Sequence, residues 1–327
     1  MRAAVLTGDH AFRVESVPDP APAPRELVLR VRACGICGSD LKSYSLMPPG
    51  AVLGHEFCGE VVAVGSAVAP AWREGQAVAA MPLAACGTCR WCMSDLPAHC
   101  ERVDLLGLGG TPGAFAEYVR VDAGSAVPLD ESLGDAGALV EPLAVGLHAA
   151  AAAEIRPGDT VLILGGGSVG ASVAVWARRL GAAEVIVSDP VAARREGAAR
   201  FGATGVHDPS AGPPRSCDVV IECVGAPGML QAALDAVVTR GRLVVAGVCM
   251  VPDAVVPVTA IMKEVQVRFA VYYRRNEFAA AAALLASGGV DPAAFVGGAV
   301  GLDRVGTAFE RMLSLTTERK ILVTPHA

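Results

Sequence analysis

Four closely spaced cysteines constrain the fold of this chain more than any other feature of its sequence. Cys86, Cys89, Cys92 and Cys100 follow the pattern C-x2-C-x2-C-x7-C within one short segment. Short turns can gather four thiolates into a closed tetrahedral shell, which is the ligand set of a structural zinc ion. The alternatives are a disulfide cluster or unrelated core cysteines, but the segment is too polar for a core. We therefore expect a zinc-binding lobe at residues 86–100.

Composition limits the class of protein. The chain has 327 residues, of which 53% are hydrophobic, and this favours two domains over one. Its formal net charge is −6, and no basic stripe or tail indicates a nucleic-acid partner. The N-terminal apolar run is too short for a signal peptide and no apolar run is long enough to span a membrane, so we expect a cytoplasmic protein. Ten cysteines in such a chain favour thiols and metal ligation over disulfides.

The first part of the chain is rich in β signals. Residues 27–33, 59–64 and 76–80 are short apolar or alternating runs bounded by turns. They predict a compact antiparallel β domain from which the four-cysteine segment protrudes. A glycine-rich loop at 107–113 leads into a further strand at 115–121.

The second part alternates between strand and helix patterns, which predicts a doubly wound parallel sheet with helices on both faces. The predicted strands are 160–164, 184–188, 218–223 and 242–248, and the predicted helices are 136–153, 169–180, 192–201 and 229–238. After them, the tail from residue 277 holds one helix and a closing strand, 320–323, that packs back on the first domain. The predicted domains are 1–145, 146–272 and 273–327.

A glycine-rich turn follows the strand at 160–164. Gly165, Gly167 and Gly170 form the pattern G-x-G-x-x-G and open a helix that contains Ser168 and Val169. The first glycine permits a tight turn, the second lets backbone N–H groups approach a pyrophosphate, and the third lets the helix pack close to the sheet. The helix N-terminus adds a favourable field for an anion. This context predicts a dinucleotide-binding site.

Asp189, at the end of the next strand, decides between the two nicotinamide cofactors. Its carboxylate can accept hydrogen bonds from the adenosine ribose and would repel a 2′-phosphate, so we predict NAD rather than NADP. Arg194 and Arg195 leave NADP open, because an arginine can receive that phosphate. The alternative for Asp189 is an ordinary turn residue. Val224 and Gly247 follow later strands and are predicted to line the nicotinamide, since ligands lie at the carboxyl ends of parallel strands.

A second set of ligands predicts a catalytic metal site. Cys37, His55, Glu56 and Glu141 offer a thiolate, an imidazole and two carboxylates, which suit an open zinc site completed by water. Such a zinc ion would act as a Lewis acid that lowers the pKa of a bound alcohol. The alternatives are a structural Cys or His, and a Glu141 that only complements the dipole of its helix.

Residues beside these ligands have predicted supporting roles. Asp40 could accept the N–H of His55, and Ser39 could hydrogen-bond a substrate hydroxyl and start a proton relay. The alternative for Ser39 is a turn cap. Four of the five cysteines outside the two sites are read as core residues; they are Cys34, Cys58, Cys217 and Cys249.

These residues together resemble the zinc-containing medium-chain dehydrogenase/reductase family, the alcohol dehydrogenase superfamily. The likeness spans nearly the whole chain and rests on the motifs C-G-S-D at 37–40, G-H-E at 54–56, E-P-L-A-V at 141–145, the glycine turn and the four cysteines. It implies a GroES-like domain with the catalytic zinc, a Rossmann domain with the cofactor, and hydride transfer in the cleft between them. It also implies two zinc ions per chain and a homodimer or homotetramer.

Two details place the sequence within that family. The Glu at 141, where ethanol-type enzymes usually have a cysteine, looks like the polyol, butanediol and threonine dehydrogenase branch. By resemblance, Glu56 and Glu141 would exchange with water as the last zinc ligand. Many relatives have a His three residues after Ser39, whereas this chain has Lys42, which would pass a proton at neutral pH only with a depressed pKa.

The sequence therefore predicts an NAD-linked, zinc-dependent dehydrogenase that oxidises a secondary alcohol, such as a diol, polyol, cyclitol or amino alcohol, to a ketone. Weak candidates for the substrate pocket are Leu46, Met47, residues 110–111 and residues 272–273. One alternative is a zinc-independent enone or quinone reductase, which would lack the ligands at 37 and 55. The other is a non-catalytic nucleotide-binding redox sensor, which need not keep Ser39 and Asp40.

Overall fold

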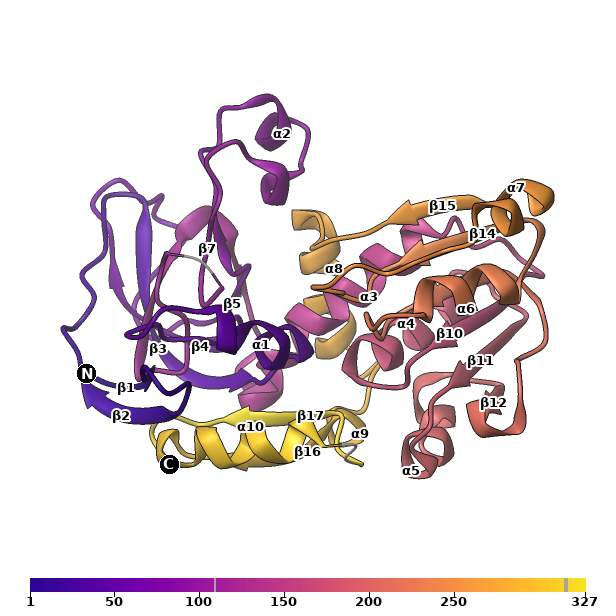
Figure 1. The fold of residues 1–327 in the computed structure, drawn as a ribbon. Coiled ribbons are helices and arrows are strands. Elements are labelled where there is room, and N and C mark those ends of the chain that lie inside the picture. The colour runs from indigo at the N-terminus through magenta and orange to yellow at the C-terminus, as the bar shows by residue number, and fades with distance from the viewer. Residues whose placement is uncertain (109, 315–316) are drawn as a thin grey trace. The chain divides into compact units, whose positions relative to one another are not determined.

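The fold comes from a computed structural model that describes residues 1–108, 110–314 and 317–327. The chain forms two compact units, and Figure 1 follows it through both. Unit 1 contains Met1–Glu141, Arg274–Ser314 and Lys320–Ala327, and unit 2 contains Pro142–Tyr273 and the segment that ends at Arg319. The last strand of the chain thus belongs to the same unit as the first.

Unit 1 is built on a seven-stranded sheet whose pairs are antiparallel except for β16 with β17. Six strands lie in the order β16 (Val296–Val300), β17 (Lys320–Val323), β3 (Glu26–Gly35), β4 (Glu56–Val64), β5 (Ala77–Ala80) and β9 (Ala126–Pro128), and β8 (Tyr118–Asp122) pairs with β3. A separate hairpin joins β1 (Arg2–Leu6) and β2 (Phe12–Ser16). The short apolar runs of the sequence correctly predicted an antiparallel domain.

Strand β3 shows why these residues form a sheet. Leu29 and Val31 are fully buried, while Arg30 and Arg32, which follow them in turn, are exposed, which is the period-two alternation of a half-buried strand. The buried side chains join a core that helix α10 (Val305–Leu313) also enters. The C-terminal part of the chain therefore completes the core of the N-terminal part.

The four-cysteine lobe is a single continuous insertion in this domain. It lies between β6 (Leu83–Ala84) and β7 (Asp104–Leu105), which pair with each other and bring the two ends of the insertion together. Its short helix α2 (Arg90–Met93) projects away from the sheet of unit 1 (Figure 1). The sequence-based interpretation of a protruding insertion matches this arrangement.

Unit 2 holds a six-stranded sheet in which every pair is parallel. The order is β12 (Gly205–His207), β11 (Glu184–Ser188), β10 (Thr160–Leu164), β13 (Cys217–Glu222), β14 (Val237–Val245) and β15 (Gln266–Phe269). Helix α4 (Ser168–Arg179) packs on β10 and β11, whereas α6 (Met229–Ala236) and α7 (Pro257–Lys263) pack by β13 and β14. The chain reverses direction across the sheet between β10 and β13, where ligands of such sheets bind.

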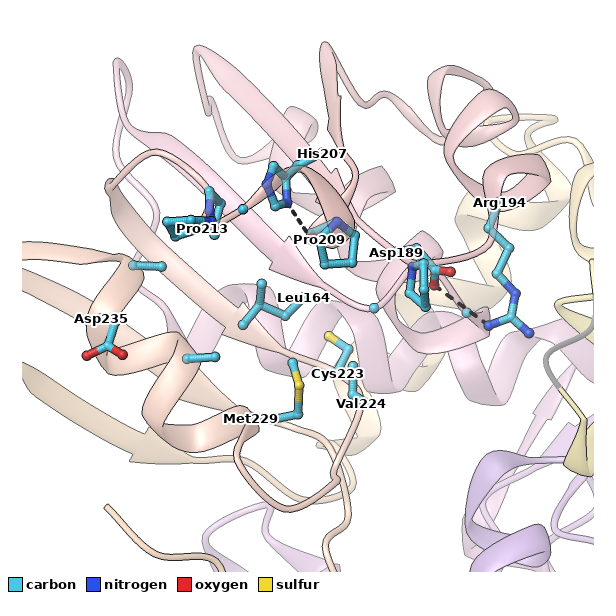
Figure 2. Close-up of a pocket in the computed structure, with 18 residues that line it drawn as sticks. Leu164, Asp189, Arg194, His207, Pro209, Pro213, Cys223, Val224, Met229 and Asp235 are labelled. Atoms are coloured by element: carbon cyan, nitrogen blue, oxygen red, sulfur yellow. Dashed lines mark hydrogen bonds and ion pairs between the residues drawn. The ribbon is translucent and has the colours of Figure 1, made fainter. Parts of the chain in front are cut away.

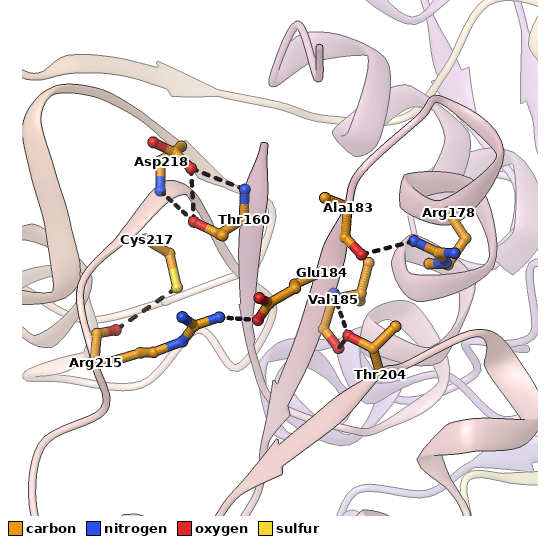
Figure 3. A network of polar contacts seen from close by, with 9 residues as sticks. All are labelled: Thr160, Arg178, Ala183, Glu184, Val185, Thr204, Arg215, Cys217 and Asp218. Carbon is orange, nitrogen blue, oxygen red and sulfur yellow. Dashed lines mark hydrogen bonds and ion pairs between the residues drawn. The ribbon is translucent and has the colours of Figure 1, made fainter. Parts of the chain in front are cut away.

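Polar contacts fix the amino ends of these strands, as Figure 3 shows. Asp218 accepts hydrogen bonds from the backbone N–H of Thr160 at 2.8 Å and from its hydroxyl at 2.7 Å. These bonds hold the pKa of Asp218 below its usual value. The Thr204 hydroxyl likewise accepts the N–H of Val185. This edge of the sheet is thus satisfied internally, and the carboxyl edge is left for ligands.

Three of the predicted elements show the clearest differences from those observed. The predicted helix 136–153 begins as 3-10 turns, Glu131–Leu139, and only α3 (Val140–Ala152) is α-helical. The predicted helix 192–201 breaks at Gly197 into α5 (Ala192–Glu196) and a 3-10 turn. The last predicted central strand ends at Val245 rather than at residue 248 because the chain turns away into the connection that leads to α7.

The tail contains more structure than the sequence indicated. Helix α8 (Arg275–Ala286) and β17 were predicted, but α9 (Pro292–Phe295), β16 and α10 were not. Strand β16 contains Gly297, Gly298 and Ala299, which carry no strand signal of their own, and it forms by pairing with β17. Within the described residues, every helix is too short or too polar to cross a membrane.

Candidate active site

Two adjacent strands of unit 1 bring three predicted metal ligands together. Cys37 follows β3 and precedes helix α1 (Gly38–Ser43), while His55 immediately precedes β4 and Glu56 begins it. The two strands are antiparallel and Gly35 pairs with Glu56, so the end of one strand meets the start of the other. One ligand atom from each of Cys37, His55 and Glu56 lies within 4.8 Å of the others.

Asp40 connects two of these ligands. Its fully buried carboxylate accepts the backbone N–H of Cys37 at 2.9 Å through Oδ2. Its Oδ1 lies 3.0 Å from Nδ1 of His55, within ion-pair range although not aligned as a hydrogen bond. Burial by itself would lower the pKa of His55, but the charges of Asp40 and Cys37 outweigh it and raise that pKa well above its ordinary value. The other ring nitrogen, Nε2, lies 3.3 Å from the Ser39 hydroxyl.

Glu56 is held by a lysine that the sequence analysis did not connect with the site. Lys320, the first residue of β17, donates to the Glu56 carboxylate and, at 3.1 Å, to the carbonyl of Ile36. Both charged side chains are 1% exposed. Burial opposes the charged ammonium, but the charges of Glu56, Cys37 and Glu141 raise the pKa of Lys320 above its usual value. The pair therefore places two buried, opposite charges at the cluster, to which Glu56 itself belongs.

Glu141 lies apart from the close cluster. It is buried in the first turn of α3, and its charge acts on Lys320. It does not belong to the set of ligand atoms that all lie within 4.8 Å of one another. Its predicted place in a metal shell stays a prediction.

Three glycine backbones meet behind His55. Gly54 has a φ of +101°, which favours glycine, and a Cβ there would lie 2.6 Å from the Phe115 ring. A Cβ on Gly107 or Gly113 would lie 2.7 Å or 2.5 Å from the carbonyl oxygen of Gly54. The loop predicted from its glycines at 107–113 therefore packs against the turn that carries His55, a contact that the sequence did not reveal.

The donor sets fit zinc. Zinc ligands at 2.0–2.3 Å place tetrahedral donor atoms roughly 3.3–3.8 Å apart, and zinc accepts sulfur, nitrogen and oxygen. The Cys37, His55 and Glu56 cluster needs only small adjustments to reach that spacing. In the lobe, Sγ of Cys92 lies 3.9 Å from Sγ of Cys86 and 3.5 Å from Sγ of Cys89, and Cys100 completes the group.

One thiol of the lobe is prepared for ligation. Sγ of Cys86 accepts hydrogen bonds from the backbone and hydroxyl of Thr88 and from the backbone of Cys89. These bonds lower the pKa of Cys86 to about 5, which favours the thiolate. Metal ligation by cysteine requires that form.

The glycine turn of unit 2 has the backbone geometry of an anion cradle. Gly165 has a φ of +98°, and a Cβ on Gly170 would lie 1.8 Å from the Gly165 carbonyl and 3.2 Å from Ile163. A Cβ on Gly167 would meet only open space, and α4 begins at the next residue, Ser168, with Val169 in its first turn. The cradle matches the geometry that a dinucleotide pyrophosphate needs.

Asp189 closes this cradle. Its buried carboxylate accepts the N–H of Gly166 at 2.7 Å and that of Val191 at 2.8 Å, so it ties the glycine turn to the end of β11. Arg194 approaches within 3.7 Å of the same carboxylate. A cavity of about 690 Å³ opens beside Asp189, and Figure 2 shows Arg194, Leu164 and Val224 around it.

Two residues that hold the predicted cofactor-binding loops were not identified from the sequence. Arg319 donates to the carbonyls of Gly166 and Arg194 and lies over the Phe201 ring, so it holds the glycine turn and the Asp189 segment together. The buried Glu222 accepts the N–H of Val224 at 2.6 Å and that of the next residue. The sequence analysis assigned no role to either residue, and only the fold reveals their partners.

The remaining predicted residues are spread over both units. Gly247 packs against the loop after β13, where a Cβ would lie 2.2 Å from the backbone nitrogen of Gly225. Lys42 lies in the last turn of α1. The Thr111 hydroxyl hydrogen-bonds to Asp104.

The weak substrate-pocket candidates differ in exposure. Leu46 is 67% exposed and Met47 is half-buried, whereas Tyr273 is 2% exposed. The backbone of Tyr272 has a φ of +54°. Their roles stay predictions.

The core assignment of the remaining cysteines holds for three of four. Cys34, Cys58 and Cys217 are buried, and burial raises the pKa of each thiol. The assignment of Cys249 was wrong. It lies beyond the end of β14, is partly exposed, and its thiol contacts the carbonyl of Val251.

Two protein-family models match the chain. Residues 23–131 match the alcohol dehydrogenase GroES-like domain, and residues 168–287 match the zinc-binding dehydrogenase family. Among curated relatives, the chain is 32% identical to sorbitol dehydrogenase of Bacillus subtilis, over all of this chain and 98% of the relative. It is 36% identical to scyllo-inosose 3-dehydrogenase of Thermotoga maritima, over 78% of this chain and 74% of the relative.

Solved structures agree with these relatives. A zinc-binding dehydrogenase from Sinorhizobium meliloti bound to NADP superposes with a TM-score of 0.90 at 33% identity, covering 99% of each chain. The 2R,3R-butanediol dehydrogenase of Bacillus subtilis superposes with a TM-score of 0.87 at 28% identity, again covering 99% of each chain.

We predict that Lys320→Met destabilises the protein by about 3–5 kcal/mol, because it leaves the Glu56 carboxylate buried without a partner. Urea unfolding would measure the free energy, and metal analysis would follow the neighbouring cluster. Lys320→Arg keeps the charge and should recover part of the stability. A Lys320→Met protein as stable as the unsubstituted one would contradict the importance of the pair.

Proposed function

The chain belongs to the zinc-dependent alcohol dehydrogenase family, and from that membership we propose that it oxidises a secondary alcohol to a ketone with NAD as hydride acceptor. The observation that carries the proposal is the cluster of Cys37, His55 and Glu56, with Ser39 and Asp40 against it. A zinc-independent reductase or a redox sensor would not require these five residues.

The class of substrate is inferred from the relatives. Their names refer to sorbitol, an inosose and butanediol, all of which are polyhydroxylated or diol-related compounds. We propose a polar secondary alcohol of the diol, polyol, cyclitol or amino-alcohol class. A panel of these alcohols, assayed with NAD and with NADP, would identify it.

In the proposed mechanism, Cys37 and His55 hold the catalytic metal, and Glu56, Glu141 or water completes its shell. When bound, zinc supplies Lewis acidity that lowers the pKa of the substrate hydroxyl. Asp40 orients the imidazole so that Nε2 faces the cluster. The Lys320 ammonium holds Glu56 in its ion pair, which disfavours ligation by that carboxylate.

Ser39 is the proposed first proton acceptor. Its hydroxyl lies 3.3 Å from Nε2 of His55, close enough to the cluster to accept a hydrogen bond from a substrate hydroxyl there. Lys42 lies in the last turn of α1 and is half-buried. Its ammonium suits hydrogen bonding to an oxygen better than proton transfer at neutral pH, so we propose that the relay continues through water.

The four-cysteine lobe is proposed to bind a second, structural zinc ion. Four thiols at nearly tetrahedral spacing leave no position open for a substrate. The expected content is therefore two zinc ions per chain, one of them in the lobe.

We propose that the chain also forms a homo-oligomer through β15. This edge strand is exposed along its whole length, and Phe269 at its end is 70% exposed. Ile261 and Met262 on the adjacent helix α7 are 68% and 75% exposed. An edge strand that exposes apolar side chains, here Val267 and Phe269, is a template for pairing with a second copy.

Cys37→Ser should remove one of the two zinc ions and lower turnover more than about a hundredfold. A loss of about a hundredfold is the largest that is typical for residues that only hydrogen-bond a metal ligand. Metal analysis and steady-state kinetics with the best alcohol of the panel would measure both. Cys249→Ser is the matched control, since its thiol lies outside both clusters and should leave zinc and turnover unchanged. Full zinc and full turnover in Cys37→Ser would refute the catalytic-metal assignment.

Asp189→Ala should lower kcat/KM for NAD about tenfold or more while affecting NADP much less. The carboxylate is proposed to bind the ribose hydroxyls and to repel a 2′-phosphate. Arg194 and Arg319 stay in place to attract that phosphate. Asp303→Ala, an exposed aspartate of unit 1, serves as control. An unchanged NAD to NADP ratio would rule out the ribose role.

Phe269→Asp should convert the oligomer to a monomer, because it places a charge on the apolar edge of β15. Analytical ultracentrifugation would measure the mass in solution. Val206→Asp places the same charge on β12, the opposite edge strand, and should not change the mass. An oligomer that survives Phe269→Asp would show that another surface carries the interface.

A further inference from the structure

The crossover from β12 to β13 lacks an α-helix. Parallel strands are usually joined by a dozen or more residues that include one. Here residues 208–216, all of them described, contain only the 3-10 turn Pro209–Ala211. Because β11 and β10 lie between β12 and β13 in the sheet, this short segment alone crosses two strands.

The apolar side chains beneath this crossover are buried from solvent but line cavities. Leu162, Leu164 and Ile186 of β10 and β11 belong to the core on the face that α6 covers. Two cavities open there, of about 690 Å³ and 360 Å³. His207 and Pro214 line both, so the crossover segment divides the space above the strands.

The larger cavity runs from the proposed cofactor site toward α6. Gly165 and Asp189 line one end, and Met229, Ala232 and Ala236 of α6 line the other. Figure 2 shows Leu164 between the two ends, with Pro213 and His207 opposite Met229. The far end is built from small or apolar side chains, with Asp235 beside them.

With the cofactor bound as proposed, its purine would enter this cavity, and we propose that the space beyond the purine binds an apolar substituent on the purine edge that faces α6. The inference rests on the proposed NAD function. With the ribose at Asp189, the purine is attached through N9, so its C6 edge points away from Asp189 along the cavity. Ala232 and Ala236 leave room past that edge, and the flexible Met229 side chain can adapt to an added group.

The test compares two NAD analogues with neutral N6 substituents, benzyl and 2-hydroxyethyl. The protein should bind the benzyl analogue at least about tenfold more tightly, because the cavity removes the apolar ring from water. Titration calorimetry on the zinc-loaded protein would give both dissociation constants, with unmodified NAD as reference. Equal affinities for the two analogues would place the substituent in solvent and overturn the proposal.

Ala232→Phe fills the far end of the cavity and should abolish the benzyl preference. Ala283→Phe, at an exposed position of α8 in unit 1, is the matched control and should keep the preference. A benzyl preference that persists in Ala232→Phe would overturn the proposal. The analogue pair tests the unsubstituted protein, so it does not depend on the folding of a variant.

The experiment distinguishes failure of the cavity proposal from failure of the proposed NAD function. If NAD binds but the benzyl analogue gains nothing, only the cavity proposal falls. If unmodified NAD does not bind, the proposed function falls, and the cavity proposal falls with it.

Discussion

The buried ion pair between Lys320 and Glu56 is the interaction on which the candidate metal centre depends. Each charge costs several kcal/mol to remove from water, and the pair is tolerable only because the two groups meet directly and the ammonium also reaches the Ile36 carbonyl. That geometry requires β17 beside β3 and fixes the end of β3, from which the Cys37 turn starts. The last strand of the chain thereby sets the position of residues near its beginning.

Three other buried carboxylates also fix loops. They are Asp40 in unit 1, and Asp189 and Glu222 in unit 2. In each case a buried carboxylate accepts backbone N–H groups from a loop at the end of a strand. Such bonds are charge-assisted, and they fix the loop before any ligand binds. The acidic side chains therefore order the loops that hold ligands.

The sequence predicted what is encoded locally. The strands at 160–164, 184–188 and 320–323 were predicted to the residue because charged or turn residues bound each apolar run. The four-cysteine cluster followed from one short motif, since residues close along the chain are also close in space there. The pairing of Lys320 with Glu56 spans 264 residues, and the contact of Gly113 with Gly54 joins separate loops. Neither leaves a local pattern, so only the fold reveals them.

The cofactor site shows the same division between local and non-local information. A glycine turn and a strand-end aspartate determine where a pyrophosphate and a ribose would bind, and both can be recognised in the sequence. The space for the purine depends instead on the length of the crossover at 208–216 and on small residues of α6 that face it. The hydrophobic periodicity of a sequence predicts which side chains are buried. It does not predict the cavity that forms where a connection is too short to contain a helix. Two chains with identical cofactor motifs can therefore differ in the cofactors that they accept, because the walls of the site come from its connections.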